Sequence, residues 1–236
     1  MDLHVRRAHA ISLNETGVRR FMKIVGLQLA LQTLTLAIFF TTAGRAETDS
    51  AAVSQHDVEA KLHYCTTCHG LSGRGFRGYY PIPRLAGQQP EYTKNQLQAF
   101  TERRRTNTIM FSVAHVLSPA MIAALASSFQ ELNPKPLGGA PKDLAAAGKK
   151  IFEEGIPNSD LAPCASCHGP EAKGVEQFPR LAGQLDDYII NKLTNWSKER
   201  GQNAAEPDTS AIMVPIAHIL TEPQIRAVAA YVSSLE

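Results

Sequence analysis

The sequence predicts an all-α protein built from two similar domains in tandem. Three observations predict this fold: a set of motifs that occurs twice, apolar residues spaced three and four apart, and a proline- and glycine-rich segment between the two copies. The chain of 236 residues has room for two domains of roughly 100 residues each. Hydrophobic residues make up 44% and charged residues 19%, which is typical of globular proteins and not of disordered ones.

The N-terminal segment has the layout of a secretory signal peptide. Basic residues precede an uncharged apolar run at 24–40, and small residues follow that run. We expect residues 1–46 to be the signal peptide, with Met22 as an alternative start of translation. The rival interpretation is an uncleaved membrane anchor, which stays open because the run lies at the lower edge of the length that spans a bilayer. Either way, we expect the folded part to lie outside the cytoplasm.

Three motifs occur twice and in the same order. They are CTTCHG at 65–70 and CASCHG at 164–169, IPRLAGQ at 82–88 and FPRLAGQ at 178–184, and IMFSVAHVLS at 109–118 and IMVPIAHILT at 212–221. The offsets between copies are 99, 96 and 103, so the approximate spacing is kept as well. We therefore expect a first domain at 51–133, a linker at 134–142 and a second domain at 143–236.

Each copy is predicted to be helical. The expected helices cover 57–64, 92–104 and 119–130 in the first copy and 143–155, 188–200 and 222–235 in the second. No alternating strand pattern is present in either copy. A domain of this size is near the limit at which a core alone is sufficient, so a cofactor that fills the interior would stabilise it.

All four cysteines lie in the doubled CxxCHG motif: Cys65, Cys68, Cys164 and Cys167. In an exported protein four cysteines predict two disulfides, and a redox dithiol in each Cys-x-x-Cys pair or a zinc site is another use of such a set. All three alternatives leave the histidines that follow, His69 and His168, without a role. Cys-x-x-Cys-His is the attachment signature of a c-type haem: two thiols one helical turn apart bond the porphyrin, and the next residue offers its imidazole to the iron. We therefore expect two haem c groups, covalently bound, with these histidines as axial iron ligands.

On these motifs the chain resembles the diheme cytochromes c of the c4 type, over residues 51 to 236. The resemblance rests on the doubled CxxCHG, the doubled PRLAGQ followed by a tyrosine (Tyr92, Tyr188), and the doubled methionine segment. It implies two tandem class I cytochrome c-like domains, each wrapped around one covalently attached haem c. It also implies low-spin haems with His/Met ligation and a relay of electrons in the bacterial periplasm toward terminal oxidases.

The methionine segments supply candidates for the second axial ligand. The repeat places Met110 opposite Met213, whereas Met121 falls in an expected helix and is expected to be core. His115 and His218 also match between the copies, so repetition alone leaves bis-histidine ligation open. In the family's motif an alanine follows the methionine at four residues and a leucine at seven, as both copies have here. The resemblance therefore implies Met110 and Met213 as axial ligands.

The PRLAGQ motif supplies candidates that surround each haem. In similar cytochromes a proline at the place of Pro83 and Pro179 accepts, through its carbonyl, the hydrogen bond from the other ring nitrogen of the ligating histidine. Such a bond fixes the tautomer and raises the basicity of the ligand. The alternative is a loop proline that only turns the chain. Arg84 and Arg180 offer a fork of donors to haem propionates, with a solvent-exposed arginine as the alternative.

Charge is distributed unevenly along the mature chain. Residues 47–142 carry ten basic and seven acidic side chains, and residues 143–236 carry eight and thirteen. The formal net charge of the whole chain is only +2, which argues against a nucleic-acid partner. The asymmetry would orient the protein between two redox partners and speed their encounter at low salt. The run Arg103-Arg104-Arg105 has no evident counterpart in the second copy and is expected to be a solvated helix face, with a docking patch as the alternative.

The predicted chemistry is one-electron transfer at each haem. An iron with histidine and methionine ligands has both axial positions filled, so it offers no open site for a substrate. We expect a periplasmic electron carrier and not an enzyme, with a quinol-oxidising complex or a dehydrogenase as donor and a terminal oxidase as acceptor. The alternatives are the cytochrome subunit of a dehydrogenase, such as a flavocytochrome sulfide dehydrogenase, and a diheme peroxidase. Peripheral or anchored association with a membrane is left open.

Replacement of Met110 tests the axial assignment. Met110→Ala should leave one haem high-spin or re-ligated, because the iron loses its thioether, whereas His115→Ala should leave both haems low-spin. Optical spectra of the two purified variants distinguish these states. The reverse pattern would assign the ligand to the histidine.

Overall fold

The computed structural model describes residues 53–200 and 209–236 of the chain. The expected signal peptide at 1–46 and the alternative start at Met22 lie outside the described residues. Within those residues the chain forms helices and four isolated β-bridges, without a β-strand, which confirms the predicted all-α class. The domain boundaries at 51–133, 134–142 and 143–236 stay predictions.

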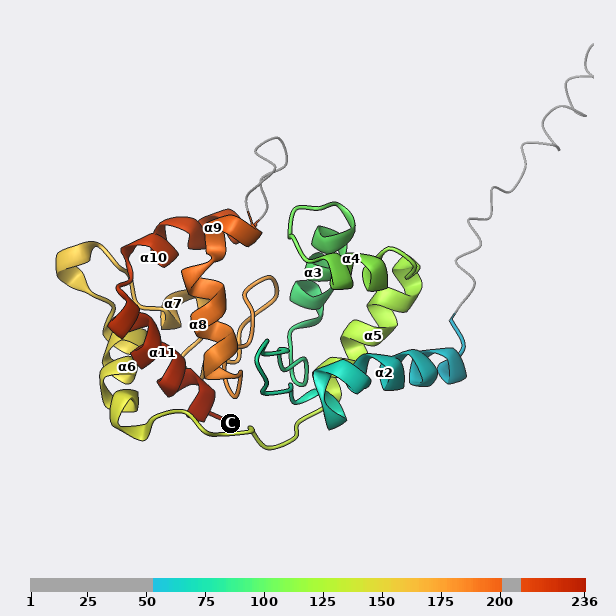
Figure 1. Cartoon of the computed structure of the whole chain (residues 1–236), viewed down its shortest axis with the longest axis horizontal. Coiled ribbons are helices and arrows are strands. Elements are labelled where there is room, and N and C mark those ends of the chain that lie inside the picture. Colours follow the sequence, from blue (N-terminus) through green and yellow to red (C-terminus); the bar gives the residue numbers. More distant parts are fainter. Residues whose placement is uncertain (1–52, 201–208) are drawn as a thin grey trace, which may run out of the picture. The chain divides into compact units, whose positions relative to one another are not determined.

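Figure 1 shows the helices of the two copies in chain order, blue to green and then yellow to red. The first copy contains α2 (Gln55–His69), η1 (Leu71–Gly73), α3 (Pro90–Thr101), α4 (Thr108–Ala114) and α5 (Pro119–Glu131). The second contains α6 (Lys142–Glu154), η2 (Pro157–Ser159), α7 (Ala165–His168), α8 (Asp186–Thr194), α9 (Trp196–Glu199), η3 (Thr209–Ile212), α10 (Met213–Ile219) and α11 (Glu222–Ser234).

The last helix of each copy begins at a cap that the sequence encodes. Ser118 caps α5 by accepting a hydrogen bond from the backbone N–H of Met121 at 3.2 Å. Thr221 and Gln224 form a reciprocal capping box at the start of α11. A proline occupies the first turn of both helices, where no intrahelical N–H is needed. These caps set where each methionine segment ends and the closing helix starts.

The core of the second copy is built around the contact between α6 and α11. Gly148 lies so close to α11 that a Cβ added there would be 1.9 Å from the carbonyl oxygen of Ala227. This close approach buries Phe152 completely against Val228 and Val232. Since only a glycine leaves room for the carbonyl, one residue of α6 fixes the distance between these two helices.

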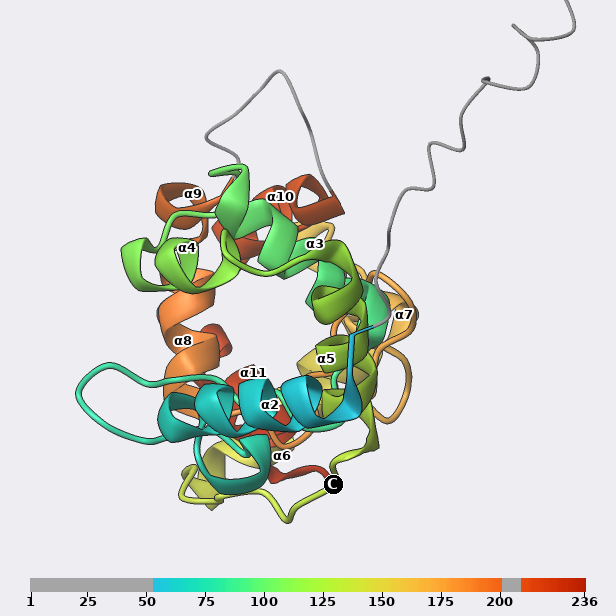
Figure 2. The same ribbon diagram turned by 90° about the vertical axis from the view of Figure 1, so that its right-hand side faces the viewer.

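The first copy is organised differently, because its N-terminal helix does not stop before the cysteine motif. Helix α2 runs through CTTCH to His69 and passes alongside one end of α5 (Figures 1 and 2). In the second copy α6 ends at Glu154, Gly155 caps it with φ of 73°, and a separate loop leads to α7. Gly155 and the prolines Pro157 and Pro163 explain the break, and the first copy has no such residues at 55–69.

One further helix differs from its sequence expectation, and one core assignment is confirmed. The helix expected at 188–200 is divided at Asn195, whose non-helical backbone separates α8 from α9. Met121 is buried in the first copy together with Leu125 and Phe129, which confirms its assignment to the core. Among the described residues no single helix has the length and apolarity to cross a membrane, although the sharply bent pair α4 and α5 together meets those two criteria.

An arginine from each copy is buried in contact with the other copy. Arg105 and Arg200 form an isolated antiparallel bridge through their backbones. Arg105 donates to the Tyr188 hydroxyl at 2.7 Å and to Gln96 Oε1 at 2.8 Å, and Arg200 donates to the Tyr92 hydroxyl at 3.4 Å. The expectation of a solvated arginine run is therefore wrong for Arg105. A signal for this contact was present in the sequence. In each copy a tyrosine is followed twelve or thirteen residues later by an arginine.

The pKa shifts of Arg105 and Tyr188 agree with the hydrogen bond between these two side chains. Burial alone would lower the pKa of Arg105, but its interactions with Tyr188 and Tyr92 outweigh that effect and raise the pKa. Burial would likewise raise the pKa of Tyr188, yet the positive charges of Arg105, Lys192 and Arg200 lower it. The buried guanidinium is therefore stabilised in its charged form by tyrosine oxygens from both copies.

A substitution at Gly148 tests the role of the α6–α11 contact. Gly148→Ala should lower the free energy of unfolding by roughly 1–3 kcal/mol, because the added methyl group forces the helices apart. Ala147→Ser, on an exposed position of the same helix, should change it by only a few tenths of a kcal/mol, roughly the difference in helix propensity. Denaturant unfolding of the haem-loaded protein, followed by far-ultraviolet circular dichroism, measures both. Equal effects would mean that the contact does not limit stability.

The two arginine–tyrosine contacts provide a matched pair of variants. Tyr188→Phe should destabilise the protein by about 1–3 kcal/mol, because it removes a partner of a buried charged donor. Tyr92→Phe should have a smaller effect, since its hydroxyl lies 3.4 Å from Arg200 rather than 2.7 Å as in the Tyr188 contact. The same unfolding measurement compares them. A larger loss from Tyr92→Phe would contradict this ranking.

Candidate functional site: two haem-binding motifs

The first CxxCH motif lies on the last turns of α2. Cys65 and Cys68 are one helical turn apart, and His69 is the final residue of the helix. The chain then reverses at Gly70, where φ is 78° and an added Cβ would be 2.2 Å from the carbonyl oxygen of Gly75. The backbone N–H of Gly75 donates to the His69 carbonyl at 2.7 Å. The glycine after the histidine is thus required by a tight turn that holds the end of the motif.

The second motif repeats this arrangement on the short helix α7. Cys164 is its N-cap and His168 its last residue, and Gly169 follows with the same φ of 78°. The backbone N–H of Gly174 donates to the His168 carbonyl at 2.8 Å. Two different preceding structures, one long helix and one loop, therefore end in the same backbone turn, although an added Cβ at Gly169 would meet no atom within 4 Å.

Both histidines are buried and held by a proline carbonyl. His69 Nδ1 lies 2.9 Å from the Pro83 carbonyl oxygen, and His168 Nδ1 lies 2.9 Å from that of Pro179. A carbonyl only accepts, so Nδ1 carries the proton and the lone pair of Nε2 is left for a metal. Burial lowers the pKa of both histidines, and the proline carbonyls partly oppose that shift. Each imidazole is therefore kept neutral, in the form that binds iron. The hydrogen bond from each histidine Nδ1 to the proline carbonyl is the contact that the role expected of Pro83 and Pro179 requires.

The thiols are available for attachment. None of the four cysteines is in a disulfide, and Cys68 is exposed. Burial raises the pKa of Cys65, against the opposing charge of Lys61, and burial also raises the pKa of Cys164. In the described part of the chain no three His, Cys, Asp or Glu side chains come together in a group that could hold a metal ion.

The two methionines occupy comparable positions in their segments. Met110 lies in the first turn of α4, where Asn107 caps the helix by accepting from the Met110 backbone N–H at 2.9 Å. Met213 is the first residue of α10. Both side chains are half-buried, unlike the core residue Met121. Their assignment as axial ligands stays a prediction.

His115 and His218, the alternative candidates for the second axial ligand, are exposed. His115 stacks on Phe111 with ring centroids 5.3 Å apart, and its Nδ1 lies 3.0 Å from the Phe111 carbonyl oxygen. His218 Nε2 lies 2.7 Å from the Ser197 hydroxyl. An exposed imidazole with a local partner is a poorer candidate for the ligand of a buried iron than a half-buried thioether.

The doubled PRLAGQ loops contact each other directly. The backbone N–H of Arg84 donates to Gln184 Oε1 at 2.8 Å, and Gln184 Nε2 donates to the Arg84 carbonyl at 3.0 Å. The backbone N–H of Arg180 donates to Gln88 Oε1 at 2.7 Å, and Gln88 Nε2 donates to the Arg180 carbonyl at 3.1 Å. All four residues are buried. Each glutamine therefore satisfies both backbone groups of an arginine in the other copy.

The Arg84 side chain shows what kind of group the first site is built to hold. Its Nε donates to the Ala86 carbonyl at 3.0 Å, but its two terminal nitrogens are buried without a hydrogen-bond partner. Burial, together with the charge of Arg180, lowers the pKa of Arg84 to about 10. A buried guanidinium is strongly destabilised unless an anion faces it, and a haem carries two propionate carboxylates. The residues present therefore fit a haem next to His69.

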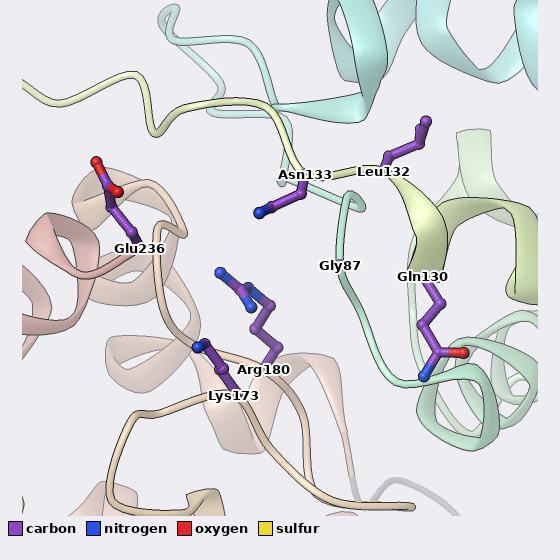
Figure 3. Close-up of a pocket in the computed structure, with 7 residues that line it drawn as sticks. All are labelled: Gly87, Gln130, Leu132, Asn133, Lys173, Arg180 and Glu236. Atoms are coloured by element: carbon purple, nitrogen blue, oxygen red, sulfur yellow. The ribbon is translucent and has the colours of Figure 1, made fainter.

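Arg180 lies in a different environment. Its Nε donates to the Ala182 carbonyl at 3.1 Å, and burial lowers its pKa. The side chain lines a pocket of about 380 Å³ beside Lys173, with Gly87 and Gln130 of the first copy among the other lining residues (Figure 3). Contact with a propionate stays a prediction for both arginines.

Comparison with known proteins agrees with these motifs. The sequence model of the cytochrome c family matches residues 60–134 and 145–236, one match in each copy. Cytochrome c-552 of Acidithiobacillus ferridurans is 38% identical over 211 residues, which cover 86% of each chain. The thiosulfate dehydrogenase electron acceptor of Thiomonas intermedia (strain K12) is 35% identical over 72% of this chain and 77% of its own.

A solved structure shows the same relationship. The cytochrome c4 of Acidithiobacillus ferrooxidans superposes with a TM-score of 0.61 at 38% identity, over 72% of this chain and 98% of its own. Two family matches, the doubled haem motif and this structural similarity together define the protein. The chain belongs to the cytochrome c family and is a carrier of electrons of the cytochrome c4 type, with two covalently bound haem c groups.

Proposed function

We propose that the protein is a periplasmic carrier that takes electrons, one per haem, from a respiratory-chain donor and delivers them to a terminal oxidase. In this proposal His69 and Met110 ligate one iron, and His168 and Met213 ligate the other. The four cysteines attach the haems, Pro83 and Pro179 orient the histidines, and Arg84 and Arg180 meet propionates. A haem held in this way supplies reversible one-electron oxidation and reduction.

The observation that carries the proposal is the direct contact between the two PRLAGQ loops. Each loop holds the acceptor of one proximal histidine and is fastened by a buried glutamine to the loop of the other copy. The two haem-binding motifs are thereby joined by buried hydrogen bonds. A defined spacing of the two motifs supports transfer of electrons between the two haems.

A second candidate concerns the donor. A relative 35% identical to this chain is named as the electron acceptor of thiosulfate dehydrogenase. That relationship favours a dehydrogenase of sulfur compounds as the source of electrons, in line with the dehydrogenase alternative expected from the sequence. Here the protein would act as the cytochrome partner of the dehydrogenase, with the same ligands and the same one-electron chemistry.

The donor can be identified by rapid kinetics on the mature haem-loaded protein. An anaerobic redox titration with optical spectra should first show two low-spin haems. Reduction is then followed after mixing with a quinol-oxidising complex plus quinol, or with thiosulfate dehydrogenase plus thiosulfate. The physiological donor should reduce both haems, and its rate should fall as ionic strength rises if the uneven charge steers docking.

Three outcomes would overturn parts of the proposal. A high-spin iron that turns over peroxide would support the diheme peroxidase alternative. A rate that does not depend on ionic strength would remove the steering role of charge. Fast reduction by thiosulfate dehydrogenase and none by the quinol-oxidising complex would replace the respiratory-chain donor with the second candidate.

A further inference from the structure

We propose that Gln184 and Gln88 are positioning residues that act across the two copies. Each glutamine sets the strength of the hydrogen bond between histidine and proline in the other copy, and thereby the reduction potential of the haem that the histidine ligates. This inference rests on the proposed ligation of iron by His69 and His168.

In the first copy both ends of one peptide group are engaged. The carbonyl of the Pro83–Arg84 peptide accepts from His69 Nδ1 at 2.9 Å. The N–H of the same peptide donates to Oε1 of Gln184, in the second copy, at 2.8 Å. A continuous chain of hydrogen bonds thus runs from the imidazole through one peptide group to a glutamine of the other copy.

The second copy contains the mirror of this chain. The carbonyl of the Pro179–Arg180 peptide accepts from His168 Nδ1 at 2.9 Å. The N–H of that peptide donates to Oε1 of Gln88, in the first copy, at 2.7 Å. Since both chains cross between the copies, the arrangement is a property of the doubled motif and not of one loop.

The orientation of each glutamine amide is fixed by its neighbours. Oε1 of Gln184 also accepts from the backbone N–H of Leu185 at 3.1 Å, and Oε1 of Gln88 accepts from that of Gln89 at 2.9 Å. Nε2 of each glutamine faces an arginine carbonyl. A flipped amide would point donors at donors and an acceptor at an acceptor, so the oxygen must face the arginine N–H.

The chemistry of the peptide group connects the two hydrogen bonds. Nitrogen and carbonyl oxygen are conjugated, so an acceptor at the N–H increases the electron density on the oxygen. In a buried chain of this kind each bond strengthens the next by roughly 10–30%. A better carbonyl acceptor makes the imidazole a more basic ligand, which stabilises the ferric state and lowers the potential. Loss of the Gln184 acceptor should therefore raise the potential of the haem attached to Cys65 and Cys68.

The test uses two substitutions at Gln184 in the haem-loaded protein. Gln184→Leu removes the acceptor, and Gln184→Glu replaces it with a stronger, charged one. A redox titration followed through the proton resonances of each haem gives the two potentials separately. At a fixed ambient potential, Gln184→Leu should lower the ferric-to-ferrous ratio of the His69 haem about threefold. With one electron and 59 mV per tenfold change, that is a rise of roughly 30 mV. Gln184→Glu should move the same haem in the opposite direction.

A second readout reports on the hydrogen bond itself. In protein labelled with nitrogen-15 at histidine, the Nδ1–H resonance of His69 should shift in Gln184→Leu, while that of His168 stays in place. Gln88→Leu should give the mirror result, and it keeps the test available if one variant fails to fold. Gln177→Leu is the matched control, because it removes a hydrogen bond between the copies, to Asn95 at 3.0 Å, that touches neither proline–arginine peptide. It should shift neither haem.

The inference is overturned if Gln184→Leu alters the His168 haem as much as the His69 haem. It is also overturned if Gln184→Leu and Gln184→Glu shift the potential in the same direction, since a purely structural role would do that. Failure of the proposed ligation would be visible separately, as the lack of two low-spin haems in the unsubstituted protein.

Discussion

The structure depends on the way in which two loops with the same sequence satisfy each other's backbone. A PRLAGQ loop presents an arginine N–H and carbonyl that no helix or strand of its own copy uses, and the glutamine of the other copy bonds to both. The preceding proline carbonyl is left to the histidine. Buried backbone groups must be paired, so neither copy alone could keep its loop in this form without other partners.

The rest of the molecule can be understood from that contact. The arginine–tyrosine pairs extend it, with Arg105 bonded to Tyr188 and Arg200 to Tyr92. Away from it the copies are free to differ, and they do. The second copy has a packed helix pair fixed by Gly148, whereas α2 of the first copy buries only His69. We infer that the first copy relies more on its haem for stability than the second.

The sequence was sufficient for the features that depend on local chemistry. The CxxCHG repeat predicted the haem, and the three- and four-residue spacing predicted helices, because both signals lie within a few turns of chain. Arg105 was missed because its burial depends on Tyr188, which is 83 residues away. The partners of Gln88 and Gln184 were not predicted, since no spacing rule shows that they lie in the other copy. The division of the expected helix at Asn195, between α8 and α9, was missed because apolar periodicity continues across it.

The hydrogen bonds between the two PRLAGQ loops are made by neutral amide groups, and this determines how the contact responds to salt. Hydrogen bonds between amides carry no net charge, so dissolved ions screen them little. The ion pair of Arg77 and Asp187, which also joins the copies, is partly exposed, so salt weakens it. A change of ionic strength would therefore weaken this ion pair, while the amide hydrogen bonds would keep the spacing of the two haem-binding motifs constant. The proposed steering by uneven charge and the internal spacing of the motifs would then depend differently on salt.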